Sequence, residues 1–211
     1  MNKIAQHSLS RSEQKRQAIL TAAKKVFLKQ GFAVASMDRI AENAQVSKKT
    51  VYHHFNNKAQ LFQDMLSEHW VQHVDNIAVL FNDRESIVSN LTRFCKIFLT
   101  FLYDKNTIDL LRVLISESAR FPDLIDCILQ GNHGPFTQQL IAFIQARHQS
   151  GELTVASPER AAAYFMGLLK EVHFWPMMLG FVKTTKPKNK QTLIDEAIAI
   201  FVGFYQVDPL V

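Results

Sequence analysis

Apolar residues in the first sixty positions recur every three or four residues, which is the spacing of an amphipathic helix. One such run extends from Ala18 to Phe27. Ser10 and Glu13 precede it as a capping-box signature, and Gly31 follows it in the usual C-terminal capping position. The pattern predicts a first helix that begins near Ser10 and ends at Gly31.

Polar capping residues mark the starts of the helices that follow. Ser36 is placed to cap a second short helix and Ser47 a third. Asn57 with Gln60 forms another capping box, which predicts a long fourth helix. Four helices are therefore expected in the first third of the chain.

Helical spacing continues through the rest of the chain. The expected ranges are 85–103 with Asp83 as its cap, 106–120, 122–130, 136–149, 158–175 and 190–205. No alternating pattern long enough for a strand, no repeat and no low-complexity tract interrupts them. The predicted fold class is all-α, with about nine to ten helices.

Positive charge is concentrated at the N-terminal end of the chain. Residues 1–60 contain eleven lysines and arginines against three acids, whereas the whole chain of 211 residues has a net charge of +5. The remaining residues are therefore acidic overall. A basic N-terminal region followed by a mildly acidic remainder predicts a polyanionic partner for the N-terminal region alone.

The segment SMDRIAENAQVSKKTVYHHFNNK, residues 36–58, has the pattern of a helix-turn-helix. Ala41 and Ala44 are small enough to let two helices approach each other closely. Val51 and Phe55, four residues apart, are placed to hold the second of these helices on the core. The side chains left exposed on it suit phosphates and base edges: Lys48, Lys49, Thr50, Tyr52 and His53.

This part of the chain resembles the TetR family of repressors. The resemblance runs from about Gln17 to Leu66 and includes ILTAAKKVFLKQGF and SMDRIAENAQVSKKTVYHHFNNKAQLF. It implies a DNA-binding domain over residues 10–56. The DNA contacts that it implies are Lys48, Thr50, Tyr52 and His53 on the recognition helix, with phosphate contacts from Ser36 and Lys58. The alternatives are that Tyr52 packs against the first helix and that the lysines are solvated surface.

Two later stretches, LLRVLISESARFPDLIDCILQGN and GELTVASPERAAAYFMGLLKEVHFWPMMLG, resemble the C-terminal domain of AefR-like members of the same family. This resemblance implies that residues 57–211 form a helical regulatory domain. Such a domain binds a small effector and makes a homodimer through its last two long helices.

The residues themselves support part of that expectation. The segment from Ala161 to Leu169 is apolar on nearly every face, which favours burial all round. The last helix has a broad apolar stripe: Ile194, Ala197, Ile198, Phe201, Val202 and Tyr205. Together these surfaces predict a four-helix dimer interface, and burial of the stripe inside one monomer is the alternative.

Aromatic and sulfur-containing side chains supply candidates for the effector pocket. The predicted lining residues are Phe98, Phe101, Phe165, Met166, His173 and Trp175. A stripe of Phe or Met is also the ordinary content of a helical core. His173 and Trp175 are the stronger candidates, because each has a polar group that needs a partner and Pro176 follows them directly. An apolar or aromatic effector suits such a lining.

The predicted function is a regulator that binds a palindromic DNA operator as a dimer and is released by the effector. An activator, a DNA-bound factor without an effector, and an enzyme with a DNA-targeting domain are the alternatives.

The sequence has no glycine-rich phosphate loop, HExxH or GxSxG motif, so no catalytic residue or cofactor is predicted. His69 and His73 have a spacing that can bind zinc, but two histidines alone do not predict a metal site. No apolar run approaches the length of a membrane span, and the two cysteines fit reduced thiols, which indicates a cytoplasmic protein.

Overall fold

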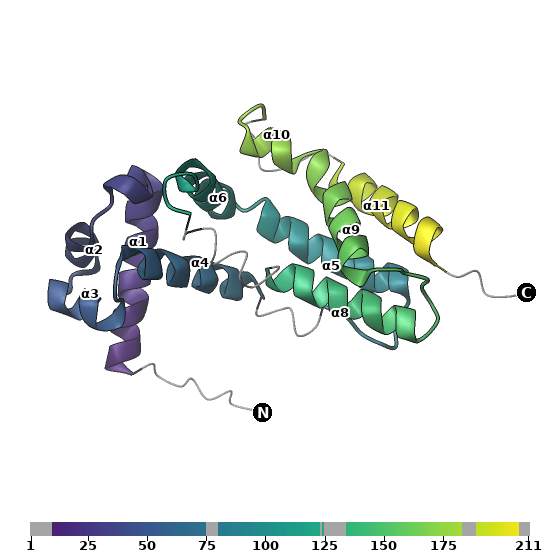
Figure 1. Ribbon diagram of the computed structural model, residues 1–211, viewed down its shortest axis with the longest axis horizontal. Helices are drawn as coiled ribbons and strands as arrows, with labels where there is room; N and C mark the ends of the chain where they lie inside the picture. The colour runs from purple at the N-terminus through teal and green to yellow at the C-terminus, as the bar shows by residue number, and fades with distance from the viewer. Residues whose placement is uncertain (1–9, 75–79, 123, 125–133, 183–188, 207–211) are drawn as a thin grey trace, which may run out of the picture. The chain divides into compact units, whose positions relative to one another are not determined.

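The computed structural model describes residues 10–74, 80–122, 124, 134–182 and 189–206. These residues form ten helices and no strand, which confirms the all-α prediction. The helices, labelled in Figure 1, are α1 (Arg11–Val34), α2 (Met37–Ala44), α3 (Lys48–His54), α4 (Lys58–Val74), α5 (Ile87–Leu102), α6 (Lys105–Glu117), α8 (Pro135–Gln149), α9 (Pro158–Glu171), α10 (Phe174–Met178) and α11 (Lys190–Tyr205). Most of the range 122–130, where another helix was expected, lies outside the described residues.

The chain divides into two compact units. The first unit comprises residues 1–69 and 110–127, and the second comprises 70–109 and 128–211. The predicted domain division after residue 56 stays a prediction, because packing groups residues beyond it with the helix-turn-helix.

The predicted caps define the helix starts in the first unit. The hydroxyls of Ser10, Ser36 and Ser47 accept hydrogen bonds from backbone N–H groups three residues ahead, at 3.1–3.2 Å. The Asn57 carboxamide oxygen accepts a corresponding bond at 2.8 Å. Gly31 has a φ of 75°, which L side chains rarely adopt, and it breaks α1 before a last turn that ends at Val34. The sequence therefore predicted all four starts correctly.

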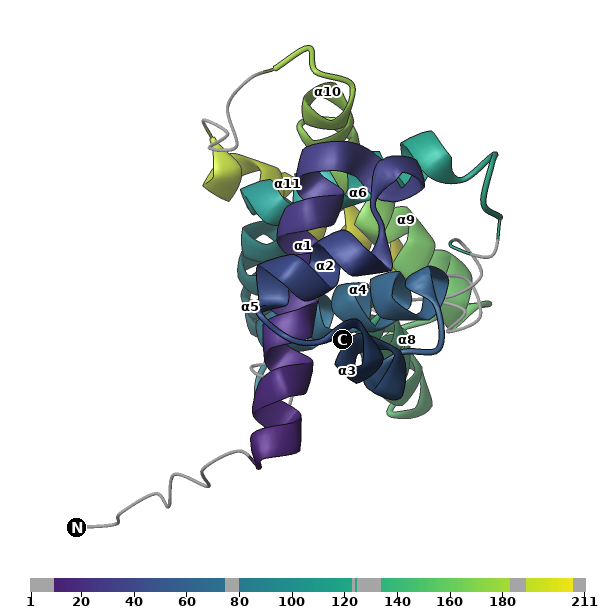
Figure 2. The ribbon, with the colours of Figure 1, turned by 90° about the vertical axis from the view of Figure 1, so that its left-hand side faces the viewer.

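An aromatic core holds the first unit together. Phe27, Phe32 and Phe62 form a triangle of ring contacts with centroids 5.0–5.7 Å apart, and Phe121 adds an edge contact to Phe32 at 4.9 Å. Helix α2 packs on α1 and also contacts α3, as Figure 2 shows. Buried Ile40 and Ala41 on α2 make this close packing possible. The two short helices are thus fixed on a rigid support.

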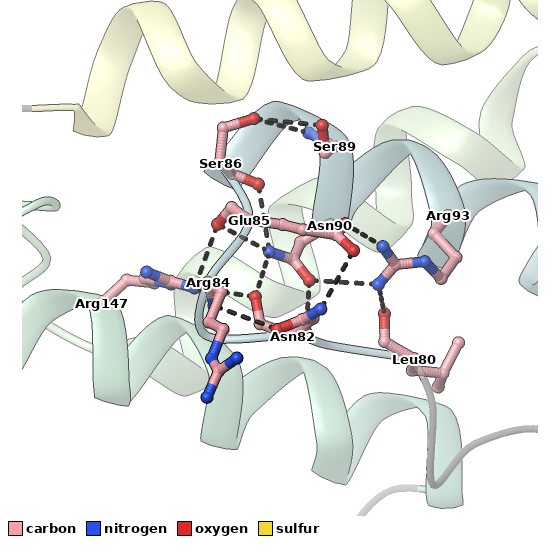
Figure 3. A network of polar contacts seen from close by, with 9 residues as sticks. All are labelled: Leu80, Asn82, Arg84, Glu85, Ser86, Ser89, Asn90, Arg93 and Arg147. Atoms are coloured by element: carbon pink, nitrogen blue, oxygen red, sulfur yellow. Dashed lines mark hydrogen bonds and ion pairs between the residues drawn. The ribbon is translucent and has the colours of Figure 1, made fainter.

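In the second unit, the start of α5 is held by a buried polar network (Figure 3). The fully buried Asn90 carboxamide donates to the backbone carbonyls of Asn82, Glu85 and Ser86 at 2.9–3.1 Å, and its oxygen accepts from the Asn82 N–H at 2.6 Å. The predicted start after Asp83 was wrong. Ser86 caps α5 instead, because Asn90 holds the preceding residues in a turn.

A proline ends α9 earlier than the sequence predicted. The helix stops at Glu171, and the short α10 begins at Phe174 and contains Pro176. A continuous helix to Trp175 was expected. Pro176 has no backbone N–H and its ring clashes with the carbonyl four residues earlier, so the chain breaks at Val172 and restarts.

Candidate nucleic-acid interface

Two buried side chains anchor the predicted recognition helix α3. Val51 and Phe55 are 0% and 1% exposed, which confirms that they face the core. Arg16 of α1 lies over the Phe55 ring, with its guanidinium carbon 5.5 Å from the centroid. The connection from α2 turns sharply at Gln45, in a left-handed conformation with φ 55°. This anchoring fixes which face of α3 meets the solvent.

The exposed face of α3 presents the predicted DNA-binding residues together. Lys48, Lys49 and His53 are exposed, and Tyr52 is 46% exposed, which excludes its packing against α1 as a core residue. The Lys48 ammonium lies 6.0 Å from the centre of the Tyr52 ring. One short helix therefore offers cations, an aromatic ring and an imidazole to a partner.

Local hydrogen bonds orient two residues of this face. The Lys48 ammonium pairs with the Asp38 carboxylate of α2 at 2.8 Å, and hydrogen bonding to Asp38 raises the pKa of Lys48. The hydroxyls of Thr50 and Ser47 lie 2.8 Å apart. Ser36 uses its hydroxyl oxygen to cap α2 and remains exposed. Its contact with a phosphate stays a prediction.

Lys58 occupies a different setting from the other predicted contacts. Its ammonium donates to the backbone carbonyls of Phe32, Ala33 and Ala35 at 2.7, 3.1 and 2.9 Å. It also lies 4.5 Å from the centre of the Phe32 ring. Burial lowers the pKa of Lys58, and the Glu117 carboxylate opposes this effect. All three donors of the ammonium are engaged within the chain. Its contact with a phosphate stays a prediction.

A basic cleft between α1 and α3 includes residues that the sequence reasoning missed. We call it the α1–α3 cleft. It has a volume of about 460 Å³ and is lined by Arg11, Ser12, Lys15, Ser47, Lys49, Thr50, His53 and His54. Arg11 and Lys15 stand four residues apart, one turn along α1. That spacing was the available signal, but only the fold brings it opposite α3.

The predicted effector residues fall into two groups. The rings of Phe98 and Phe101 both contact Phe136, and Phe94 links Phe98 to Phe165. The buried Met166 follows Phe165 on α9. Trp175 is 40% exposed and contacts Phe174, and His173 precedes α10. The phenylalanines thus form one cluster, and the lining role of all six residues stays a prediction.

One buried polar group in the second unit has no hydrogen-bond partner in the described part of the chain. The Tyr103 side chain is 6% exposed, and its hydroxyl makes no hydrogen bond to any of the described residues. Burial raises the pKa of Tyr103 to about 12. A buried hydroxyl without a partner is rare in native proteins, and a bound water or ligand is a common explanation.

The predicted dimer stripe on α11 faces the interior of the chain. Ile194, Ala197, Ile198 and Phe201 are at most 4% exposed, whereas Val202 and Tyr205 are half-buried, so most of the stripe packs within the chain. A dimer through the last two long helices stays a prediction. The segment 161–169 is likewise not buried all round, because Tyr164 is 61% exposed. Periodicity identifies an apolar face but not what covers it.

A different apolar surface lies between α9 and α11. Ile200 and Phe204 on α11 are 57% and 79% exposed, beside Tyr164 on α9. They border a groove of about 580 Å³, which is lined by Ala163, Tyr164, Phe165, Gly167, Leu168, Glu171, Ile200, Phe201, Phe204 and Tyr205. We call it the α9–α11 groove. Large exposed apolar patches of this kind mark interaction surfaces.

Neither a metal site nor a membrane span is found in the described part of the chain. His69 is buried, with its Nδ1 atom 3.2 Å from the Lys24 ammonium, whereas the His73 side chain lies outside the described residues. No three described His, Cys, Asp or Glu side chains come together as metal ligands. A membrane-spanning segment would need greater length and apolarity than any described helix has.

Comparison with known proteins gives the same picture for both parts of the chain. Residues 19–65 match the family "Bacterial regulatory proteins, tetR family", and residues 89–207 match "AefR-like transcriptional repressor, C-terminal domain". The second match alone covers more than half of the chain.

Individual relatives agree with this assignment. The crystal structure of a TetR family transcriptional regulator from Pseudomonas syringae pv. tomato is 31% identical, with a TM-score of 0.76 over 93% of this chain and 99% of that chain. The uncharacterized regulator YvkB of Bacillus subtilis is 24% identical over 191 residues, 90% of this chain and 96% of the relative. The activator FasR of Mycolicibacterium smegmatis is 40% identical over 65 residues, 31% of this chain and 28% of that protein.

Fold, surface and comparisons define a helix-turn-helix transcriptional regulator that binds DNA. The chain belongs to the TetR family, with a C-terminal domain of the AefR-like type. Members of this family are regulators rather than enzymes.

Proposed function

We propose that the protein is a cytoplasmic repressor that binds a palindromic operator as a homodimer and releases it when a small apolar or aromatic effector binds. The observation that supports this most directly is the face of α3. Val51 and Phe55 hold the helix on the core, so that Lys48, Lys49 and Tyr52 are left for DNA. The match to an AefR-like repressor domain supports the sign of regulation.

We assign base and phosphate contacts according to chemistry and exposure. Tyr52 is the proposed base-reading residue, because its ring and hydroxyl suit the thymine methyl and base edges, and Thr50 and His53 are proposed to contact DNA beside it. Lys48 and Lys49, with the Ser36 hydroxyl, are the proposed phosphate contacts. Lys58 is proposed to act indirectly, by fixing the segment that leads into α2.

For the dimer, the proposed interface is the α9–α11 groove, occupied by a second copy of the chain. Tyr164, Ile200 and Phe204 would pack against the same surface of the partner across a two-fold axis. Substituting Phe204 by Glu should convert the dimer to a monomer in analytical ultracentrifugation. The Lys29→Glu variant, an exposed change in the other unit, should remain a dimer. A Phe204→Glu variant that stays dimeric would exclude this interface.

For the effector, the proposed site lies among the phenylalanines of the second unit. Apolar rings favour an apolar or aromatic ligand. The Tyr103 hydroxyl, which has no hydrogen-bond partner among the described residues, is proposed to give such a ligand one hydrogen bond. Linkage then requires that the effector bind the DNA-released conformation more tightly than the DNA-bound one.

The experiment that tests the proposed function uses DNA from beside the protein's own gene. Labelled duplexes that tile the upstream region are titrated with the protein, and the affinity should fall steeply as salt is raised. Aromatic compounds are then added to the complex, and release should follow. Absence of binding at low salt for every duplex would contradict the proposal.

An activator is the second candidate. The relative FasR, which matches over the helix-turn-helix region, is an activator by name. A reporter gene under the upstream region separates the two: deletion of the regulator should raise expression for a repressor and lower it for an activator.

A further inference from the structure

The α1–α3 cleft has the chemistry of an anion site. Each of its eight lining residues bears a cation, an imidazole or a hydroxyl, and none of these eight is acidic or apolar. We propose that this cleft binds a phosphate of the DNA backbone next to the bases that α3 reads. The proposal rests on the proposed function and adds a contact from α1 that the family resemblance did not supply.

The cations of the cleft are available for a ligand. The side chains of Arg11, Lys15 and Lys49 are exposed, and no ion pair to another described residue neutralises them. Two cations just outside the cleft differ, since Arg16 pairs with Asp64 at 2.9 Å and Lys48 pairs with Asp38. Three cations without an ion pair to a described residue therefore meet in this one cleft.

The two walls of the cleft are built to the same spacing. Arg11 and Lys15 stand one turn apart on α1, and Lys49 and His53 stand one turn apart on α3. Their helices are fixed at this end by the caps Ser10 and Ser47. Little ordering of the backbone is then needed when a phosphate enters between the walls, which favours tight binding.

The donors point to a backbone phosphate rather than to bases. Ser12 and Thr50 add hydroxyls to the charged groups, and phosphate oxygens accept from both kinds of donor. The lining has no carboxamide or carboxylate, the groups that read adenine and cytosine, so its cations and hydroxyls suit the phosphate oxygens that every sequence shares. The cleft should therefore increase affinity for every DNA sequence alike.

The His54 imidazole couples this contact to pH. The rings of His53 and His54 are 5.4 Å apart. Burial lowers the pKa of His54, as do the positive charges of His53, Arg16 and Lys15, whereas Glu13 raises it. A phosphate in the cleft would oppose these effects and raise the pKa of His54. Binding would then take up protons, so affinity should rise as the pH falls from about 8 to 6.

A pair of charge-matched variants tests the cleft. The first is Arg11→Gln/Lys15→Gln, and the control is Lys25→Gln/Lys29→Gln, which removes two exposed cations from the same helix outside the cleft. Fluorescence anisotropy is measured with a labelled duplex of mixed sequence at about 50–200 mM salt. Circular dichroism verifies that both variants are folded.

The expected result is a weaker salt dependence in the first variant alone. The slope of log K against log salt should become shallower by about 1 for each phosphate that the variant no longer neutralises, while the control keeps the wild-type slope. In a second arm, His53→Gln/His54→Gln should bind with an affinity that no longer rises between about pH 8 and pH 6. If wild type binds and both charge variants keep equal slopes, the cleft proposal is wrong and the function stands. If wild type binds no duplex at low salt, both are overturned.

Discussion

Replacing Lys58 by Met separates a structural role from a phosphate contact. Methionine keeps the apolar stem over the Phe32 ring but removes the ammonium, which leaves the carbonyls of Phe32, Ala33 and Ala35 without their donor. By donating to these carbonyls, Lys58 holds the segment that leads from α1 into α2. The variant should therefore be less stable, and α2 should lose its fixed entry.

The size of the effect follows from the three hydrogen bonds. A bond to a charged group contributes about 1.5–3 kcal/mol, but the three are not additive and water can reach this half-buried site. We expect a loss of about 2–4 kcal/mol in the free energy of unfolding. For a chain of this length, that lowers Tm by about 4–16 °C.

The assay combines stability with DNA binding. Thermal and urea unfolding are followed by circular dichroism at one fixed protein concentration, because association makes Tm concentration-dependent. Lys25→Met, an exposed change on α1, is the control and should leave Tm within about 2 °C of wild type. A Lys58→Met variant with wild-type Tm and a salt slope shallower by about 1 would contradict the structural role and assign Lys58 to a phosphate.

Three further predictions concern the second unit. Asn90→Ala should lower the free energy of unfolding by about 2–4 kcal/mol, because it strips a buried turn of four hydrogen bonds; an unchanged urea midpoint would contradict this. Burial raises the pKa of the Cys95 thiol from 9.0 to about 12. The contribution of the protonated thiol to the stability of the fold is therefore full below pH 9 and is lost as the pH rises from 9 to 12. In a Cys127→Ser background, labelling of Cys95 by a thiol reagent at pH 8 should require unfolding. Tyr103→Phe should raise or preserve Tm without effector but weaken release of DNA by one, and a lower Tm would show that the hydroxyl has a partner in the free protein.

Local signals explain what the sequence predicted well. Ser36, Ser47 and Asn57 each bond to a backbone N–H three residues ahead, so the helix starts depend only on near neighbours. Val51 and Phe55 were identified from spacing within one helix, and both are buried. The recognition helix was therefore predictable from a short segment.

Contacts between distant residues explain what the sequence could not predict. The turn before α5 depends on the buried side chain of Asn90, which moves the helix start from Asp83 to Ser86. Periodicity revealed an apolar face on α11 but not that Ile198 is buried within the chain while Phe204 is exposed. The α1–α3 cleft arises only when the first turn of α1 is brought opposite α3.

Measuring how Tyr52 contributes to DNA specificity tests directly whether α3 reads the operator. Affinities for an upstream operator and for a mixed-sequence duplex are measured for wild type, Tyr52→Ala and the exposed control Lys25→Ala. If α3 reads DNA, Tyr52→Ala should lose most of the preference for the operator while keeping its fold, and Lys25→Ala should keep that preference. An unchanged operator preference in Tyr52→Ala would show that sequence is read elsewhere.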